Sequence, residues 1–170
     1  RDLFVQHYRG IRAACAGFKQ PGLALIALER GGVAATACIA AKGGEVNTAV
    51  LGRHGLADVY LPIDPALSLR HLMIILHPDH LGEPTRFRIV NLRTDTGFAD
   101  EDDRRLDAVE ADGPVFIRCG AYTLLCFPIG PDTVWPDEAE AGWAQMPERV
   151  FLDEWDSPPP RIRNRRAEVT

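Results

Sequence analysis

Short apolar runs separated by turn residues fill the chain from Gly22 to Phe127, and this pattern constrains the fold more than any other feature. Runs of this length and spacing are typical of a β-sandwich or barrel. The alternative, a parallel α/β fold, needs crossovers of about a dozen or more residues, usually helices. Glu101 to Val109 is too short and too charged for that role. We therefore predict an all-β fold, an antiparallel β-sandwich. Strands are expected at Leu23–Leu28, Ala35–Ala41, Val46–Gly52, Asp58–Leu61, Arg70–Leu76, Arg86–Leu92 and Val115–Phe127.

The last of these runs is expected to form a hairpin. Gly120 and Ala121 lie between the apolar segments VFIRC and YTLLC. A glycine in the first position of a two-residue turn suits a type II′ turn, whose twist matches that of the flanking strands. The sequence therefore predicts two closing strands joined at Gly120.

A different pattern precedes the predicted sandwich, in residues 1–21. Apolar side chains recur there every three or four positions, which is the spacing of an amphipathic α-helix. Pro21 closes the segment, because proline lacks a backbone donor and disfavours a helical residue before it. We expect a helix from Asp2 to Phe18, packed on the sandwich or on a neighbouring subunit.

The composition changes again after the sandwich, which we assign to residues 22–127. Residues 128–170 are rich in proline and acidic side chains, and such a segment cannot bury enough apolar surface to form its own core. We expect a Pro-rich acidic tail. The aromatic residues that could dock it on the sandwich are Trp135, Trp143, Phe151 and Trp155. Its basic cluster consists of Arg161, Arg163, Arg165 and Arg166.

Charge and hydropathy argue against two classes of partner. The formal net charge of -5 disfavours general nucleic-acid binding. Apolar stretches such as Gly22 to Leu28 are far shorter than the roughly 18 residues that a membrane span needs. We expect no nucleic-acid partner and no membrane partner. The four cysteines form no CxxC motif, which favours reduced core thiols and a cytoplasmic location. Because the chain begins at Arg1 without methionine, we expect a fragment of a longer protein.

Motifs for catalysis or for a bound cofactor are not evident. The sequence has no GxSxG elbow for a nucleophile and no GxxxxGK[ST] loop for a nucleotide. His77 to His80 includes two histidines and an aspartate, but zinc would need a further protein ligand from elsewhere. We therefore expect a binding protein and not an enzyme, with no metal and no cofactor.

Three loops between the predicted strands carry polar residues in a distinctive order. The first is Gly52-Arg53-His54, the second Leu67-Ser68-Leu69-Arg70-His71, and the third Asn91-Leu92-Arg93-Thr94-Asp95-Thr96-Gly97. Asp112-Gly113 then precedes the closing hairpin. This succession resembles the forkhead-associated (FHA) family, whose pattern runs Gly-Arg, Ser-Arg-x-His, Ser-x-Asn-Gly and a Gly-Asp-like turn before a hairpin. The resemblance covers about Leu23 to Phe127 and implies an FHA-like β-sandwich.

The resemblance also implies a function, which is to bind a phosphothreonine-containing segment of a partner protein. A phosphate carries nearly two negative charges and three strong acceptors, so it needs an arginine, hydroxyl donors and backbone amides from separate loops. By similarity, Arg53 would supply the charged donors, while the hydroxyls of Ser68 and Thr94 would complete the cradle. From the residues alone, Arg53 could instead pair with Asp58 or Asp64, and Ser68 could cap a turn.

Three further residues would support this site by similarity. His71 matches the family's buried histidine, which braces the loops without touching the ligand. Gly52 and Gly97 match loop glycines, where the backbone needs room or a positive φ.

Some positions depart from the family's pattern. Thr96 stands where the family has an asparagine that grips the bound peptide, and a hydroxyl replaces only part of that contact. Leu69 stands where a second basic residue commonly follows the serine, although Arg70 could compensate. Phe98 replaces the usual threonine. Each hydrogen bond to a charged group contributes about 1.5–3 kcal/mol, so the loss of one or two would weaken phosphopeptide binding. The alternative is a divergent FHA scaffold that contacts a protein, or a second copy of itself, without phosphate.

Overall fold

β1 (Gly22–Glu29) and β10 (Tyr122–Ile129) are neighbouring antiparallel strands that are buried on both faces. Leu23 and Leu25 point into the main core of the sandwich, whereas Ile26 and Leu28 belong to a second core that includes side chains of the N-terminal helix. Because neither face of β1 is exposed to solvent, its sequence is one continuous apolar run instead of an alternation of apolar and polar residues.

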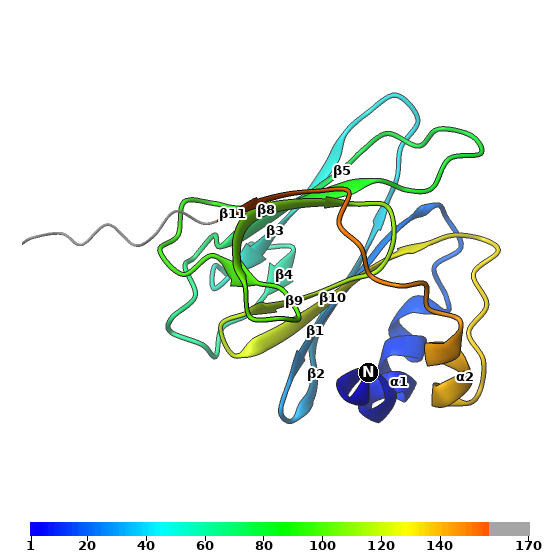
Figure 1. Cartoon of the computed structure of the whole chain (residues 1–170), viewed down its shortest axis with the longest axis horizontal. Coiled ribbons are helices and arrows are strands. Elements are labelled where there is room, and N and C mark those ends of the chain that lie inside the picture. The colour runs from blue at the N-terminus through cyan, green and yellow to red at the C-terminus, as the bar shows by residue number, and fades with distance from the viewer. Residues whose placement is uncertain (157–170) are drawn as a thin grey trace, which may run out of the picture.

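The structure is a computed structural model that describes residues 1–156 (Figure 1). Its strands besides β1 and β10 are β2 (Gly32–Ala40), β3 (Asn47–Gly52), β4 (Val59–Tyr60), β5 (Leu72–Leu76), β6 (Phe87–Asn91), β7 (Phe98–Ala99), β8 (Arg105–Ala111), β9 (Val115–Cys119) and β11 (Asp153–Asp156). The strand order is β2-β1-β10-β9-β7-β8-β6-β5-β3-β4, and β11 pairs with β8.

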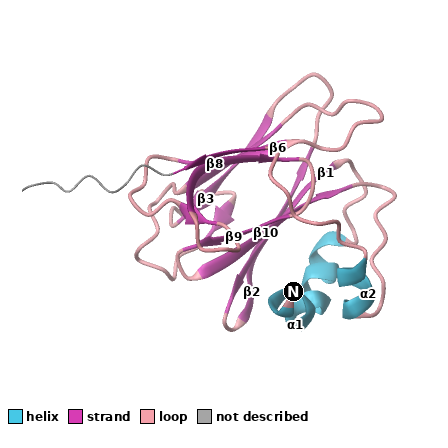
Figure 2. Ribbon diagram, in the orientation of Figure 1, coloured by secondary structure: helices cyan, strands magenta, loops and turns pink. Residues whose placement is uncertain are grey.

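The strands form two facing layers, with β3, β6 and β8 in one and β1, β2, β9 and β10 in the other (Figure 2). β7 pairs with both β8 and β9 and so joins the layers. The predicted antiparallel β-sandwich is confirmed, with one correction: β3 and β4 are parallel. Residues 53–58 bring the chain back beside Leu51 before it continues in the same direction, which places Val59 next to Leu51.

Sequence analysis assigns no strand to β7, β8 or β11, and for β8 the reason is visible in its pairing. Trp155 lies opposite Ala108 and Asp156 opposite Leu106, so Asp107 is an extra residue in β8. Such a bulge disrupts the ladder locally. The buried residues Leu106 and Val109 are three positions apart, which hides the alternation that identifies a strand.

The N-terminal helix, α1 (Asp2–Cys15), buries Phe4, Tyr8, Ile11 and Cys15 along one face. Its existence is confirmed, but the predicted end at Phe18 is wrong. The Phe18 N–H binds the carbonyl of Cys15, three residues back, in a tight turn. Glycine is a weak helix former, and Gly17 lies in this turn. The helix therefore ends before the last apolar position of the pattern.

Part of the predicted tail is ordered against this helix. A short helix, α2 (Ala139–Ala144), brings the Trp143 ring to 5.5 Å from the ring of Phe4, between centroids. Trp135 packs on Phe127 at 6.2 Å. The docking expected of these two tryptophans is thus present. The basic cluster from Arg161 to Arg166 lies outside the described residues.

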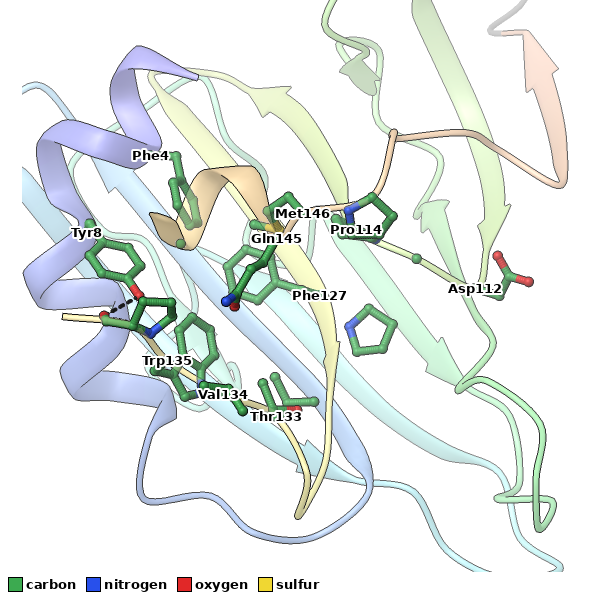
Figure 3. A pocket seen from close by; sticks show the side chains of 16 residues that line it. Phe4, Tyr8, Asp112, Pro114, Phe127, Thr133, Val134, Trp135, Gln145 and Met146 are labelled. Carbon is green, nitrogen blue, oxygen red and sulfur yellow. Dashed lines mark hydrogen bonds between the residues drawn. The ribbon is translucent and has the colours of Figure 1, made fainter. Parts of the chain in front are cut away.

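A hollow of about 320 Å³ opens between α1, α2 and the end of β10 (Figure 3). Phe4, Tyr8, Phe127 and Trp135 line it, and the Tyr8 hydroxyl donates a hydrogen bond of 2.8 Å to the Pro136 carbonyl. None of the predicted site residues lines this hollow. Within residues 1–156, neither helix is long and apolar enough to cross a membrane.

Candidate functional site

The three loops singled out in the sequence lie at one end of the sandwich, away from the two helices. They are residues 53–58 after β3, residues 61–71 before β5, and residues 92–97 after β6. Figure 1 shows them together at its left side, whereas α1 and α2 lie at the lower right. The predicted site residues are thus brought to one end of the molecule.

The first two loops are joined by backbone hydrogen bonds. The Arg53 N–H donates to the Ser68 carbonyl at 3.1 Å, and the His54 N–H donates to the Leu69 carbonyl at 3.0 Å. Gly52 lies at the point of closest approach, where a Cβ atom would be 2.2 Å from the Leu69 carbonyl oxygen. A side chain at position 52 would force the two loops apart.

His71 joins the second loop to the third. Its side chain is only 1% exposed, and it is the one buried polar residue among those that the structure describes. The ring Nδ1 accepts a hydrogen bond from the Ser68 N–H at 3.1 Å, so the proton of the neutral ring is on Nε2, which lies 2.8 Å from the Gly97 carbonyl oxygen. One imidazole ring therefore spans the distance between the two loops.

Burial has a consequence for the charge of His71. It lowers the pKa of the ring below the ordinary value of 6.5, and it outweighs the Gly97 hydrogen bond and the charge of Asp64, which both raise the pKa. Protonation would also remove the lone pair that receives the Ser68 N–H. The loops are therefore held by the neutral histidine.

Asn91, the last residue of β6, organises the third loop. Its side-chain oxygen accepts bonds from the Thr94 N–H at 3.0 Å and from the Thr94 hydroxyl at 2.6 Å. Its amide nitrogen donates to the Thr94 carbonyl at 3.0 Å and to Asp107 at 2.9 Å. The sequence places Asn91 at the start of the third polar segment but assigns it no individual role, although asparagine commonly folds a loop in this way.

The Thr94 hydroxyl is engaged inside the same loop. It donates its proton to Asn91 and accepts the Gly97 N–H at 3.0 Å. Gly97 has a φ of +55°, the left-handed region that glycine adopts without strain. Thr96 is exposed, and its hydroxyl oxygen lies 3.4 Å from the His71 Nε2. Of these two hydroxyls, only that of Thr94 donates its proton to another side chain, that of Asn91 at the end of β6.

Arg53 is half-buried, and its Nε donates to the Leu67 carbonyl. In residues 1–156, no carboxylate lies within ion-pair distance of its guanidinium. The two acids considered from the sequence are used elsewhere: Asp58 accepts the Val50 N–H at 2.8 Å and Asp64 accepts the Ala121 N–H at 2.7 Å. The terminal nitrogens of Arg53 thus remain available as donors.

Ser68 and Arg70 complete the second loop. The Ser68 backbone is bonded on both sides, through its N–H to His71 and through its carbonyl to Arg53, but its hydroxyl makes no hydrogen bond to the described residues. The Arg70 side chain is exposed. Asp64 also positions this loop, because it links the segment before Ser68 to the turn between β9 and β10. An Asp-Pro pair, as in Asp64-Pro65, is a known signal for such a turn.

Comparison with known proteins gives a fold but no close relative in sequence. No family model matches the chain, and no curated protein matches it. Among solved structures, the FHA domain of the CT664 protein from Chlamydia trachomatis has a TM-score of 0.52 and 18% identity, covering 64% of this chain and 99% of that chain.

Two yeast structures are similar in the same way. The FHA domain of Dun1, solved in complex with a doubly phosphorylated peptide derived from Rad53, has a TM-score of 0.55 and 15% identity, covering 82% of this chain and 92% of that chain. Full-length Pml1p has a TM-score of 0.50 and 13% identity, covering 74% of this chain and 93% of that chain. This chain therefore has the forkhead-associated fold, at 13–18% sequence identity to these three structures.

Proposed function

We propose that this chain is a protein-binding module that recognises a phosphothreonine-containing segment of a partner through the loops beside β3, β5 and β6. The observation that carries this proposal is the pairing of Arg53 with Ser68. Their backbones are hydrogen-bonded to each other, while the Arg53 terminal nitrogens and the Ser68 hydroxyl have no partner in residues 1–156. The Dun1 structure, which holds a phosphorylated peptide, supports the same use of this fold.

The loop geometry suits a doubly charged anion. Hydrogen bonds to a charged group contribute about 1.5–3 kcal/mol each, and they lose less entropy when the donors are already held in place. Backbone hydrogen bonds hold the first two loops together, and the His71 ring holds the second loop to the third. In this conformation Thr94 would have to release Asn91 before donating to a phosphate, whereas Thr96 and Arg70 are exposed donors on the adjoining loops.

Removal of Arg53 tests this proposal. Titration with a library of phosphothreonine peptides should show binding by the wild type and a loss of about tenfold or more in Arg53→Ala, since one charge-assisted bond is worth at least about 1.5 kcal/mol. Arg30→Ala is the matched control, because Arg30 is an exposed arginine in the turn between β1 and β2. Equal binding of phosphorylated and unphosphorylated peptides would refute phosphate recognition.

A second candidate function is a phosphate-independent contact through the same end of the sandwich. Three large apolar side chains are exposed there: Leu56 is 88% exposed, Ile63 68% and Leu69 53%. Exposed apolar side chains at a loop end favour a protein surface as the partner, either another protein or a second copy of this chain. In that case Leu69→Glu should abolish the interaction while Arg53→Ala and phosphatase treatment of the partner leave it unchanged.

We further propose that the module acts by binding alone, and that it works in a reducing compartment such as the cytoplasm. All four cysteines are free thiols in the structure. Extracellular domains of this size commonly carry disulfides, whereas cytosolic thiols stay reduced.

A further inference from the structure

Two of the free thiols meet where α1 packs on β2. Cys15 is the last residue of α1 and is fully buried, whereas Cys38 lies in β2 and is half-buried. The Cys38 thiol donates to the carbonyl oxygen of Ala14, the residue before Cys15, with the sulfur 3.8 Å from that oxygen. The two thiols lie close enough that each shifts the pKa of the other. Two thiols that are far apart in the sequence are thus neighbours in the second core.

The two thiols differ in reactivity. The interaction with Cys15 lowers the pKa of Cys38 despite the opposing effect of burial, whereas the interaction with Cys38 and burial raise the pKa of Cys15. The thiolate is the form that reacts with oxidants, and Cys38 is also the one that solvent reaches. Cys119 provides a contrast, since burial raises its pKa to about 12.

We propose that Cys15 and Cys38 are a peroxide-sensitive pair that forms a disulfide between α1 and β2. In the first step the Cys38 thiolate attacks hydrogen peroxide, the O–O bond breaks, and hydroxide leaves, so that Cys38 becomes a sulfenic acid. In the second step the Cys15 sulfur attacks the Cys38 sulfur, Cys15 loses its proton, and the hydroxyl of the sulfenic acid leaves as water. Two thiols and one peroxide give one disulfide and two waters.

The position of Cys15 favours the second step. Cys15 directly follows the residue whose carbonyl accepts the Cys38 thiol, so the two side chains start as neighbours. Because thiol-disulfide exchange reverses the reaction, a thiol reductant should restore the original state.

The disulfide would fasten the helix to the sandwich. Cys15 ends the helix that contributes Phe4 and Tyr8 to the second core, and a cross-link from residue 15 to residue 38 removes freedom from the unfolded chain. For a loop and a chain of this size, the expected rise in melting temperature is roughly 6–12 °C.

The test is peroxide treatment of the full chain, followed by peptide mapping without reductant. The expected product is one peptide pair linked through Cys15 and Cys38, with a higher melting temperature that dithiothreitol reverses. Cys15→Ser should instead accumulate a sulfenic acid on Cys38 that dimedone traps, and Cys38→Ser should prevent both products.

The internal control is the pair of deeply buried thiols, Cys119 and Cys126. They should stay unmodified for as long as the protein is folded. A folded, peroxide-treated protein without the linked peptide overturns the proposal, as does dimedone labelling of Cys119 or Cys126 ahead of Cys38. The phosphopeptide assay with Arg53→Ala is independent of these outcomes.

Discussion

Replacement of His71 by alanine should separate the loops of the candidate site, and the size of the effect can be worked out from its hydrogen bonds. The ring receives the Ser68 N–H and lies within hydrogen-bond distance of the Gly97 carbonyl. An unpaired buried polar group costs about 1–3 kcal/mol. With both backbone groups left unpaired, the free energy of unfolding should fall by about 2–6 kcal/mol.

Urea unfolding measures this change in free energy, and two other substitutions at position 71 separate the contributions of the two ring nitrogens. His71→Asn keeps an acceptor near the position of Nδ1, and His71→Gln keeps a donor near the position of Nε2, so each should recover part of the loss. Ser68→Ala is the control, because it removes a hydroxyl without a partner among the described residues and should change stability by no more than about 0.5 kcal/mol. The reasoning is refuted if His71→Ala unfolds within that same margin of the wild type.

Two further predictions concern the same loops. Because the pKa of His71 is lowered on folding, the unfolded chain takes up a proton before the folded one does, so stability should be full above pH 6.5 and should fall as the pH drops below it. Urea unfolding at a series of pH values measures this, and a slope that His71→Gln leaves unchanged would count against it. Gly52→Ala should lower the free energy of unfolding by about 1–3 kcal/mol through overpacking against the Leu69 carbonyl. Gly55→Ala, where a Cβ meets nothing within 4 Å, is its matched control, and equal stability of the two variants would show that the loops can part freely.

The apolar runs of the sequence predict most of the sandwich because most of its strands bury one or both faces. β1 and β10 are found easily, since their runs are continuous. β8 is not predicted because the bulge at Asp107 breaks its alternation of buried and exposed residues. β11 is not predicted because its residues, Asp153 to Asp156, are all exposed. The sequence does not predict the short helix α2 either, because its position depends on Trp143 packing on Phe4 and not on an apolar pattern of its own.

For the candidate site, the sequence places the loops but not the bonds within them. Gly52 and His71 could be singled out because a motif contains them, and the structure supplies a close approach and a pair of hydrogen bonds at these positions. Asn91 could not, because its role depends on Thr94 folding back on its side chain. The phosphate contacts assigned to Arg53, Ser68 and Thr94 remain predictions, and of these three it is Thr94 whose hydroxyl already serves the loop.

Burial of β1 and β10 on both faces also bears on how small a working version of this protein can be. A fragment trimmed to residues 22–127 would keep every loop of the candidate site but would strip α1 from Ile26, Leu28 and Phe127. These apolar side chains would then be exposed to water, and exposed apolar patches drive self-association. Precipitation of such a fragment would therefore result from the loss of α1 and not from misfolding of the candidate site. Polar substitutions at Ile26 and Leu28 would distinguish the two, because they should restore solubility only in the first case.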